Sequence, residues 1–300
     1  TVAIETALKA LGVEAGDEVI VPAVTFIASA SGVLMAQGVP VFADILPDTY
    51  QIDPRSVEAM ITKRTRGIVV VHYGGYPVNM DEIKKIARKY KLFVFEDCAH
   101  AQGSQWKGKG VGAIGDMGSF SFQQSKALTS GEGGIILTNN YRLWDNAYAY
   151  HTIGRTLGSQ MYEHIMVGPN YRLTELQSAL LNTQLQKYKK QIKIKMKNAA
   201  YLSRELRKIG LEPLKEDKRI TRRGYYYYIF RYNKKLFKDV HRDVFREACA
   251  AEGVTIGKGY GRPVYAYPVF RNNYFGRTGC PVSCSKYKGK MDYSKVKLPV

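Results

Sequence analysis

Short apolar runs alternate with helical patterns along the first half of the chain. Between the runs, apolar residues recur at helical spacing over 26–37, 53–61 and 81–90. Strands that alternate with helices build mostly parallel sheets with helices on both faces. The pattern therefore predicts an α/β fold with a mostly parallel central sheet. The strand-like runs are 17–22, 39–44, 67–72, 92–97, 118–122 and 133–139.

The pattern changes in the second half. A long helix is predicted from about residue 170 to 209, because apolar residues recur in steps of three, four and seven. A tyrosine-rich strand over 225–232, a helix over 238–253 and a final stretch of loops should follow. We expect a large domain over 1–185 and a smaller, incomplete α+β C-terminal domain over 186–300. The apolar positions of the long helix are Leu185, Tyr188, Ile192, Ala199, Leu202, Leu206 and Ile209.

The chain is strongly basic, with 45 Lys and Arg against 26 Asp and Glu and a net charge of +19. Basic residues crowd 184–208, which could mark a nucleic-acid surface. No nucleic-acid-binding motif accompanies them, and the apolar stripe of the long helix leaves them on its solvated face. We expect no nucleic-acid partner, and an overall positive field that attracts anionic substrates.

Composition and cysteine content argue against a membrane-spanning, metal-binding or disulfide-rich protein. No run approaches the roughly 20 apolar residues of a membrane span, and 45% hydrophobic with 24% charged residues is typical of a soluble globular protein. Cys280 and Cys284 lie four apart, but no second His or Cys pair completes a metal site. We expect no metal and a reducing, cytoplasmic location. Because the chain opens in a helical rhythm without Met, it is predicted to be a fragment of a longer product.

Two glycine-rich stretches resemble phosphate-binding motifs without completing them. Residues 103–110 (GSQWKGKG) end in Gly110, where the phosphate-binding loop has the Ser or Thr that ligates magnesium. Residues 110–115 (GVGAIG) match the dinucleotide-binding spacing, but a strand-like run follows instead of a helix. Both stretches are therefore predicted to form a hairpin-like excursion.

A single lysine ends an apolar strand. Lys126 follows the run 118–122, and Gly131, Gly133 and Gly134 come soon after it. Most such lysines are solvated loop residues, but a lysine amine can also form a Schiff base with an aldehyde cofactor or a carbonyl substrate. For pyridoxal phosphate, the chemistry needs an acid on the pyridine nitrogen, a stacked aromatic ring and groups that hold the phosphate.

The sequence offers each of these groups. Asp97 and Phe26 follow strand-like runs, at the carboxyl ends where parallel sheets bind ligands. Ser121 lies five residues before Lys126. Each also has a structural interpretation, which is a helix cap for Asp97, core packing for Phe26 and a contact between strands for Ser121.

Four longer motifs make the chain similar to a known family. They are GDEVIVPAVTFIASASGVLMAQGVPVFADI, FEDCAHAQGS, GDMGSFSFQQSKALTSGEGGIILTN and VGPNYRLTELQSALL, in that order. Together they resemble the DegT/DnrJ/StrS family of pyridoxal-phosphate sugar aminotransferases, over at least residues 1–210. The resemblance implies fold type I of the PLP-dependent transferases. QQSK, with TRRGYYYYIFRYN and YGRPVYAYPVF, looks most similar to the glutamine-dependent branch that aminates keto-cyclitols such as scyllo-inosose.

The resemblance implies a cofactor site residue by residue. Lys126 matches the Schiff-base lysine, and Asp97 matches the acid on the pyridine nitrogen. His100 matches the residue beside the cofactor's 3-hydroxyl, Phe26 the stacking aromatic, and Ser121 a phosphate-binding serine. Lys126 and Asp97 are thus the expected catalytic residues.

Further positions are implied at the phosphate and between subunits. Thr1 and Val2 match the end of a Gly-Thr turn that holds phosphate. Asn170 matches an asparagine that reaches the cofactor of the neighbouring subunit, and Arg172 is close to that site, where it would bind substrate. The implied assembly is a homodimer with shared active sites.

The expected function is transfer of an amino group from glutamine or glutamate to a keto-sugar or keto-cyclitol, with pyridoxal 5′-phosphate held by Lys126. Two alternatives stay open at this point. One is a dehydratase or aromatising relative that uses the same cofactor. The other is a non-catalytic protein that binds the cofactor and regulates a partner.

Overall fold

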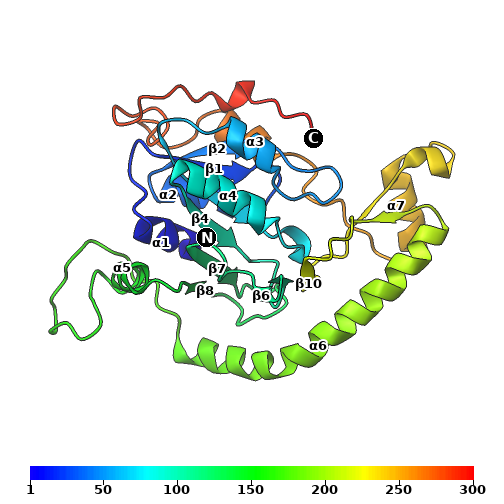
Figure 1. Cartoon of the computed structure of the whole chain (residues 1–300), viewed down its shortest axis with the longest axis horizontal. Coiled ribbons are helices and arrows are strands. Elements are labelled where there is room, and N and C mark those ends of the chain that lie inside the picture. Colours follow the sequence, from blue (N-terminus) through cyan, green and yellow to red (C-terminus); the bar gives the residue numbers. More distant parts are fainter.

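A six-stranded sheet forms the centre of the molecule (Figure 1). The structure is a computed structural model that describes residues 1–300. All neighbouring strands are parallel except β7 and β8, which pair antiparallel. The predicted mostly parallel sheet is therefore confirmed. In sheet order the strands are β2 (Val39–Ala43), β1 (Glu18–Pro22), β3 (Thr65–Val71), β4 (Phe93–Asp97), β7 (Met117–Ser121) and β8 (Gly134–Leu137).

Helices cover both faces of this sheet. One face packs against α1 (Val2–Ala10), α2 (Ala28–Met35) and α5 (Tyr141–His151). The other face packs against α3 (Pro54–Ala59) and α4 (Met80–Tyr90). The helices predicted over 26–37, 53–61 and 81–90 are thus present; α2 and α3 are shorter than predicted, and α4 begins one residue earlier.

Strand β1 shows why the strand runs are continuously apolar. Val19 and Val21 belong to the core cluster under α1 and α2, whereas Ile20 belongs to the cluster under α3 and α4. All five residues of β1 are buried. Strands covered on both faces need apolar residues at every position, so they lack the polar–apolar alternation of half-exposed strands.

The glycine-rich stretch between β4 and β7 binds the protein's own carboxylate. Strands β5 (Gln105–Trp106) and β6 (Lys109–Gly110) pair antiparallel, which confirms the predicted hairpin. The backbone N–H groups of Gly112, Ile114 and Gly115 then donate to the buried Glu96 carboxylate at 2.9, 2.7 and 2.6 Å. Burial alone would raise the pKa of Glu96, but hydrogen bonds from His72 and these N–H groups outweigh burial and lower it. This segment is therefore a fixed support next to Asp97.

Helix α6 (Glu175–Lys208) begins five residues later than predicted. Thr174 caps it, since its hydroxyl accepts from the Gln177 N–H and the Gln177 side chain accepts from the Thr174 N–H. Of the predicted apolar stripe, Tyr188, Ile192 and Ala199 are buried, whereas Leu185, Leu202 and Ile209 are exposed. The helix extends from beneath the sheet toward α7 (Figure 1), so only part of its length contacts the body.

The prediction of a tyrosine-rich strand over 225–232 is wrong. Only Phe230–Arg231 forms a strand, β11, which pairs with β9 (Glu212–Pro213). Tyr225 takes a φ of +48°, which breaks an extended run. Before it, β10 (Ile220–Arg222) adds to the β5–β6 hairpin. Helix α7 (Arg242–Ala251) lies within the predicted range.

The C-terminal segment is mostly loop, as predicted, with a short helix α8 (Pro268–Arg271). The division at residue 185 stays a prediction. None of the helices is long and apolar enough to span a membrane. Buried side chains of this segment join the core cluster that includes α1 and α2, and they are Val264, Phe270, Val282, Tyr287 and Tyr293.

Candidate active site

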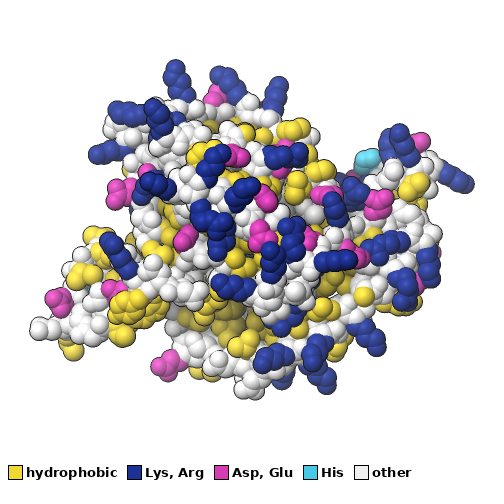
Figure 2. Space-filling model, in the orientation of Figure 1, with side chains coloured by type: hydrophobic (Ala, Val, Ile, Leu, Met, Phe, Trp, Pro, Cys, Tyr) yellow, Lys and Arg dark blue, Asp and Glu magenta, His cyan; other side chains and the backbone are white.

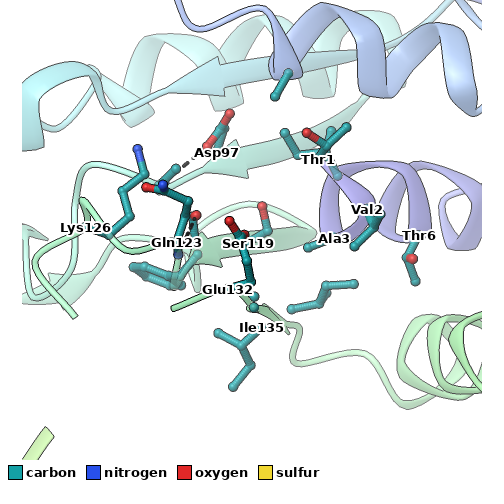
Figure 3. A pocket seen from close by; sticks show the side chains of 18 of the residues that line it. Thr1, Val2, Ala3, Thr6, Asp97, Ser119, Gln123, Lys126, Glu132 and Ile135 are labelled. Carbon is teal, nitrogen blue, oxygen red and sulfur yellow. Dashed lines mark hydrogen bonds between the residues drawn. The ribbon is translucent and has the colours of Figure 1, made fainter. Parts of the chain in front are cut away.

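One large cavity, of ≈ 1030 Å³, opens at the carboxyl ends of β4 and β7 (Figure 3). The start of α1, the loop after β7 and residues 226–227 form its other sides. Open parallel sheets bind their ligands at this edge. All of the predicted site residues except Asn170 line the cavity, namely Thr1, Val2, Phe26, Asp97, His100, Ser121, Lys126 and Arg172.

Asp97 is the last residue of β4 and is only 5% exposed. Its Oδ2 accepts from the Ser29 hydroxyl at 2.8 Å, and its Oδ1 accepts from the Ala99 N–H at 3.1 Å. Because Ser29 has only one hydroxyl hydrogen, Thr25 must donate to Ser29, at 2.9 Å. This chain of hydrogen bonds fixes the direction of the carboxylate, which has no basic side chain within ion-pair distance.

Lys126 is presented by a tight turn after β7. Its N–H donates to the Gln123 carbonyl at 2.9 Å. The Gln123 Oε1 accepts from both the N–H and the hydroxyl of Ser125, at 2.8 and 2.7 Å. The Lys126 Nζ lies 4.6 Å from the centre of the Tyr226 ring and forms no ion pair. Figure 3 shows Lys126 and Gln123 on one side of the cavity, Thr1, Val2, Ala3 and Thr6 on the other, and Asp97 between them.

His100 is buried beside Lys126. Its Nδ1 accepts from the Gly74 N–H at 3.4 Å, so the hydrogen-bond network assigns the proton of the neutral ring to Nε2. Burial, together with the charge of Lys126, lowers the pKa of His100 to about 3. The ring is therefore neutral near pH 7 and can donate one hydrogen bond through Nε2.

Gly75 allows the chain to approach His100 closely. Gly75 adopts a φ of +83°, and a Cβ atom there would lie 2.8 Å from the Tyr225 nitrogen and 2.9 Å from the His100 carbonyl. Only glycine fits this position without displacing backbone. Residues 73–76 (YGGY) thus hold residues 225–227 against the site, a role for which the sequence alone gave no signal.

The start of α1 faces the cavity across from Asp97. Thr1 is the N-cap and Val2 the first residue of this nine-residue helix, whose free N–H groups favour an anion. Ser121 lies at the end of β7, and Ser119 on the same strand also reaches the cavity. Phe26 is 57% exposed, so it is not a core residue. Its nearest aromatic neighbour is Tyr260, with ring centres 6.5 Å apart.

Asn170 lies outside the cavity of its own chain. Its side chain is exposed, and its Oδ1 accepts from the Arg172 Nε at 2.9 Å. Arg172 lines the cavity. The structure also adds site residues that the sequence interpretation missed, which are Thr25, Ser29, Ser119, Tyr226, Tyr227 and Tyr260.

The model of the DegT/DnrJ/EryC1/StrS aminotransferase family matches residues 1–292. The chain belongs to this family. It is similar to the L-glutamine:2-deoxy-scyllo-inosose aminotransferase of Streptomyces fradiae, with 40% identity over 249 residues. That match covers 80% of this chain and 59% of the relative.

Solved structures agree with this family membership. An aminotransferase from Psychrobacter cryohalolentis has a TM-score of 0.84 and 32% identity, over 94% of this chain and 77% of that one. The 3-amino-5-hydroxybenzoic acid (AHBA) synthase has a TM-score of 0.82 and 33% identity, over 89% and 70%. The predicted family, fold class and aminotransferase activity are thereby confirmed.

Proposed function

We propose that this aminotransferase depends on pyridoxal 5′-phosphate and moves an amino group from glutamine to a keto-cyclitol of the inosose type. The observation that carries the proposal is that one cavity contains both Lys126 and the buried Asp97 carboxylate, which forms no ion pair. The printed name of the Streptomyces fradiae relative supports glutamine as donor and an inosose as acceptor. Glutamate and nucleotide-linked keto-sugars are the alternatives to test.

The residues of the cavity fit the cofactor. Asp97 has no basic partner, so its carboxylate is free to hold a protonated pyridine nitrogen. The His100 Nε2 can donate to the 3-hydroxyl oxygen, Phe26 can cover one face of the ring, and Ser121 with the start of α1 can bind the phosphate. When bound, pyridoxal phosphate supplies an aldehyde for amines and a ring that withdraws electrons from the attached carbon.

Lys126 would act as the general base and then the general acid of the transfer. A lysine amine near the α-carbon of a bound amino donor can take up its proton and release it to an adjacent atom. The structure supports this role because the amine forms no ion pair and lies on a turn that is open to the cavity. Asp97 and its Ser29–Thr25 chain would keep the ring charged throughout.

The test is an acceptor screen. The cofactor-loaded protein is incubated with glutamine or glutamate and with scyllo-inosose, 2-deoxy-scyllo-inosose or nucleotide keto-sugars. Amine formation on an inosose, with glutamine preferred, is the expected result. Amination of nucleotide sugars alone would overturn the acceptor, and no amine product with any pair would overturn the proposed function.

A second candidate is an aromatising relative, because AHBA synthase shares the fold over most of this chain. The same screen decides between them. An aromatic product, seen by its ultraviolet absorbance when an aminated, unsaturated cyclic ketone is offered, would favour that candidate over amino transfer.

We further propose a homodimer with shared sites. Asn170 is exposed and does not line the cavity of its own chain, and the nearby excursion 152–168 carries exposed apolar side chains. Figure 2 shows hydrophobic side chains on this projecting part of the molecule. Three of them are highly exposed, namely Met161 at 79%, Tyr162 at 80% and Val167 at 96%. Monomeric proteins rarely leave such groups uncovered.

A mixing experiment tests the shared site. Lys126→Ala chains are mixed with Asn170→Ala chains and activity is followed as heterodimers form. If Asn170 serves the partner's site, one site of each heterodimer carries both changes and the other carries neither, so activity rises above either parent. If activity stays flat, Asn170 acts within its own chain and the shared site is refuted.

A further inference from the structure

Of the four tyrosines at 225–228, two line the cavity and two contact other parts of the protein. The Arg223 guanidinium lies between two rings, 5.0 Å from the centre of Tyr76 and 4.4 Å from the centre of Tyr225. The Tyr228 hydroxyl is 2.8 Å from the Ser203 hydroxyl on α6. Arg223 and Tyr225 therefore anchor the segment. Tyr228 contacts α6 outside the cavity, whereas Tyr226 and Tyr227 line it.

Tyr226 contacts both Lys126 and His100. Its ring stacks on the His100 ring, with centres 4.2 Å apart and planes within 20°. The Lys126 Nζ lies over the same ring at 4.6 Å. The Tyr226 hydroxyl is 3.1 Å from the Ser125 hydroxyl, whose hydrogen already goes to Gln123, so Tyr226 is the donor. One side chain thus ties the lysine turn to the histidine.

We infer that Tyr226 is a positioning residue for amino transfer, an inference that rests on the proposed function. Its ring holds the Lys126 amine whenever that amine is free, and it fixes the plane in which the His100 Nε2–H points. A protonated amine is attracted to the face of an aromatic ring. Without the ring, Lys126 has no other charged or aromatic partner and would sample more orientations. The ring, more than the hydroxyl, carries this function.

The test compares Tyr226→Leu, which removes the ring, with Tyr226→Phe, which keeps it. Tyr228→Leu is the matched control, because it makes the same change in the same segment away from the cavity. Tyr226 belongs to none of the buried core clusters, so its loss should leave the fold intact, which circular dichroism checks. Two quantities are measured on the full chain, namely kcat of the loaded enzyme and the acylation rate of Lys126 in cofactor-free protein.

We expect Tyr226→Leu to lower kcat at least about ten-fold, with little change in KM for glutamine, because the amine is misplaced. The acylation rate of Lys126 should rise about three- to five-fold, as the cation–ring contact is lost. For Tyr226→Phe and Tyr228→Leu, kcat and the acylation rate should both stay within about two-fold of the wild type. Each variant loses only a hydroxyl contact or a contact outside the cavity, so the Tyr226 ring stays in place.

Three results would overturn the inference. They are unchanged kcat and acylation in Tyr226→Leu, equal losses in Tyr226→Leu and Tyr228→Leu, or a Tyr226→Phe variant as impaired as Tyr226→Leu. If the wild type transfers no amino group at all, the proposed function fails. The acylation rates then still show whether Tyr226 holds the lysine.

Discussion

Two sides of the same cavity are built in different ways. The cavity floor, defined as Asp97, Ser119, Ser121 and Thr1, comes from the ends of adjacent strands β4 and β7 and from the start of α1. The cavity wall, defined as Tyr226, Tyr227 and Tyr260, comes from irregular segments far along the chain. The floor is part of the sheet, whereas the wall is brought to it by tertiary contacts.

The difference suggests that the floor and the wall have different roles. Sheet hydrogen bonds and two apolar clusters support the floor, so its groups are held rigidly where a cofactor ring and phosphate would bind. The wall segment is held by tertiary contacts instead, among them Arg223 between two rings, the Gly224 N–H on the Ser104 hydroxyl and the close approach at Gly75. Changes to the floor should therefore damage the chemistry, and changes to the wall should adjust binding and positioning.

Apart from Lys126 itself, the substitution expected to lower kcat most is one in the cavity floor. Asp97→Asn should retain the cofactor but lower kcat about 100-fold or more, because an amide cannot keep the pyridine nitrogen protonated. Ser29→Ala is the matched control and should lose about ten-fold at most, since it removes one hydrogen bond to the carboxylate. Steady-state rates with glutamine measure both. Turnover within a few-fold of the wild type in Asp97→Asn would make Asp97 a structural cap.

A smaller effect is expected where floor and wall meet. The pKa of His100 is lowered to about 3 in the folded chain, against about 6.5 when unfolded. Between these values the unfolded state binds a proton that the folded state does not, so stability is lost as pH falls below 6.5. From pH 8 to pH 5 this costs about 2 kcal/mol.

His100→Gln should escape this loss. Urea unfolding of cofactor-free protein at pH 8 and pH 5 measures it, with the wild type losing about 2 kcal/mol more than the variant. Parallel losses in both proteins would show that the histidine is protonated in the folded state. The stacking of His100 on Tyr226 would then no longer be a contact between neutral rings.

The smallest effect is expected at the exposed edge of the cavity. Phe26→Ala should weaken cofactor affinity about ten-fold, the scale of one aromatic stacking contact. The free energy of unfolding should change by less than about 0.5 kcal/mol, because the side chain is mostly exposed. Cofactor titration by fluorescence and urea unfolding measure the two quantities. A large loss of stability with unchanged affinity would instead support the core-packing interpretation.

The same contrast explains what the sequence could predict. Part of the floor was predictable, since Asp97 and Ser121 lie near the ends of apolar runs that predict strands, and parallel strands end at one edge of a sheet. The wall was not, because four consecutive tyrosines have a strand-like composition. What breaks the strand is distant in sequence, namely the Arg223 contact with Tyr76 and the approach of Gly75 to Tyr225. Ser29 was missed because its link to Asp97 spans 68 positions.

The long helix shows the same limit. Its periodicity predicted one continuous apolar stripe, yet Leu185 and Leu202 are exposed while Tyr188 and Ile192 are buried. Periodicity reports which face is apolar, but not how much of a helix has a neighbour to pack against. Most lysines of the helix are exposed, as expected for a solvated face, but Lys195 is half-buried against Tyr188.

Whether Lys126 serves a bound pyridoxal phosphate in amino transfer can be measured in the first half-reaction. Glutamine is added to the cofactor-loaded protein without any acceptor, and the visible absorbance and the released 2-oxo acid are recorded. We expect the absorbance to fall and one 2-oxo acid to form per site. Neither change is expected in a folded Lys126→Ala variant. Equal release of 2-oxo acid by that variant, or none by the wild type, would show that Lys126 does not have this role.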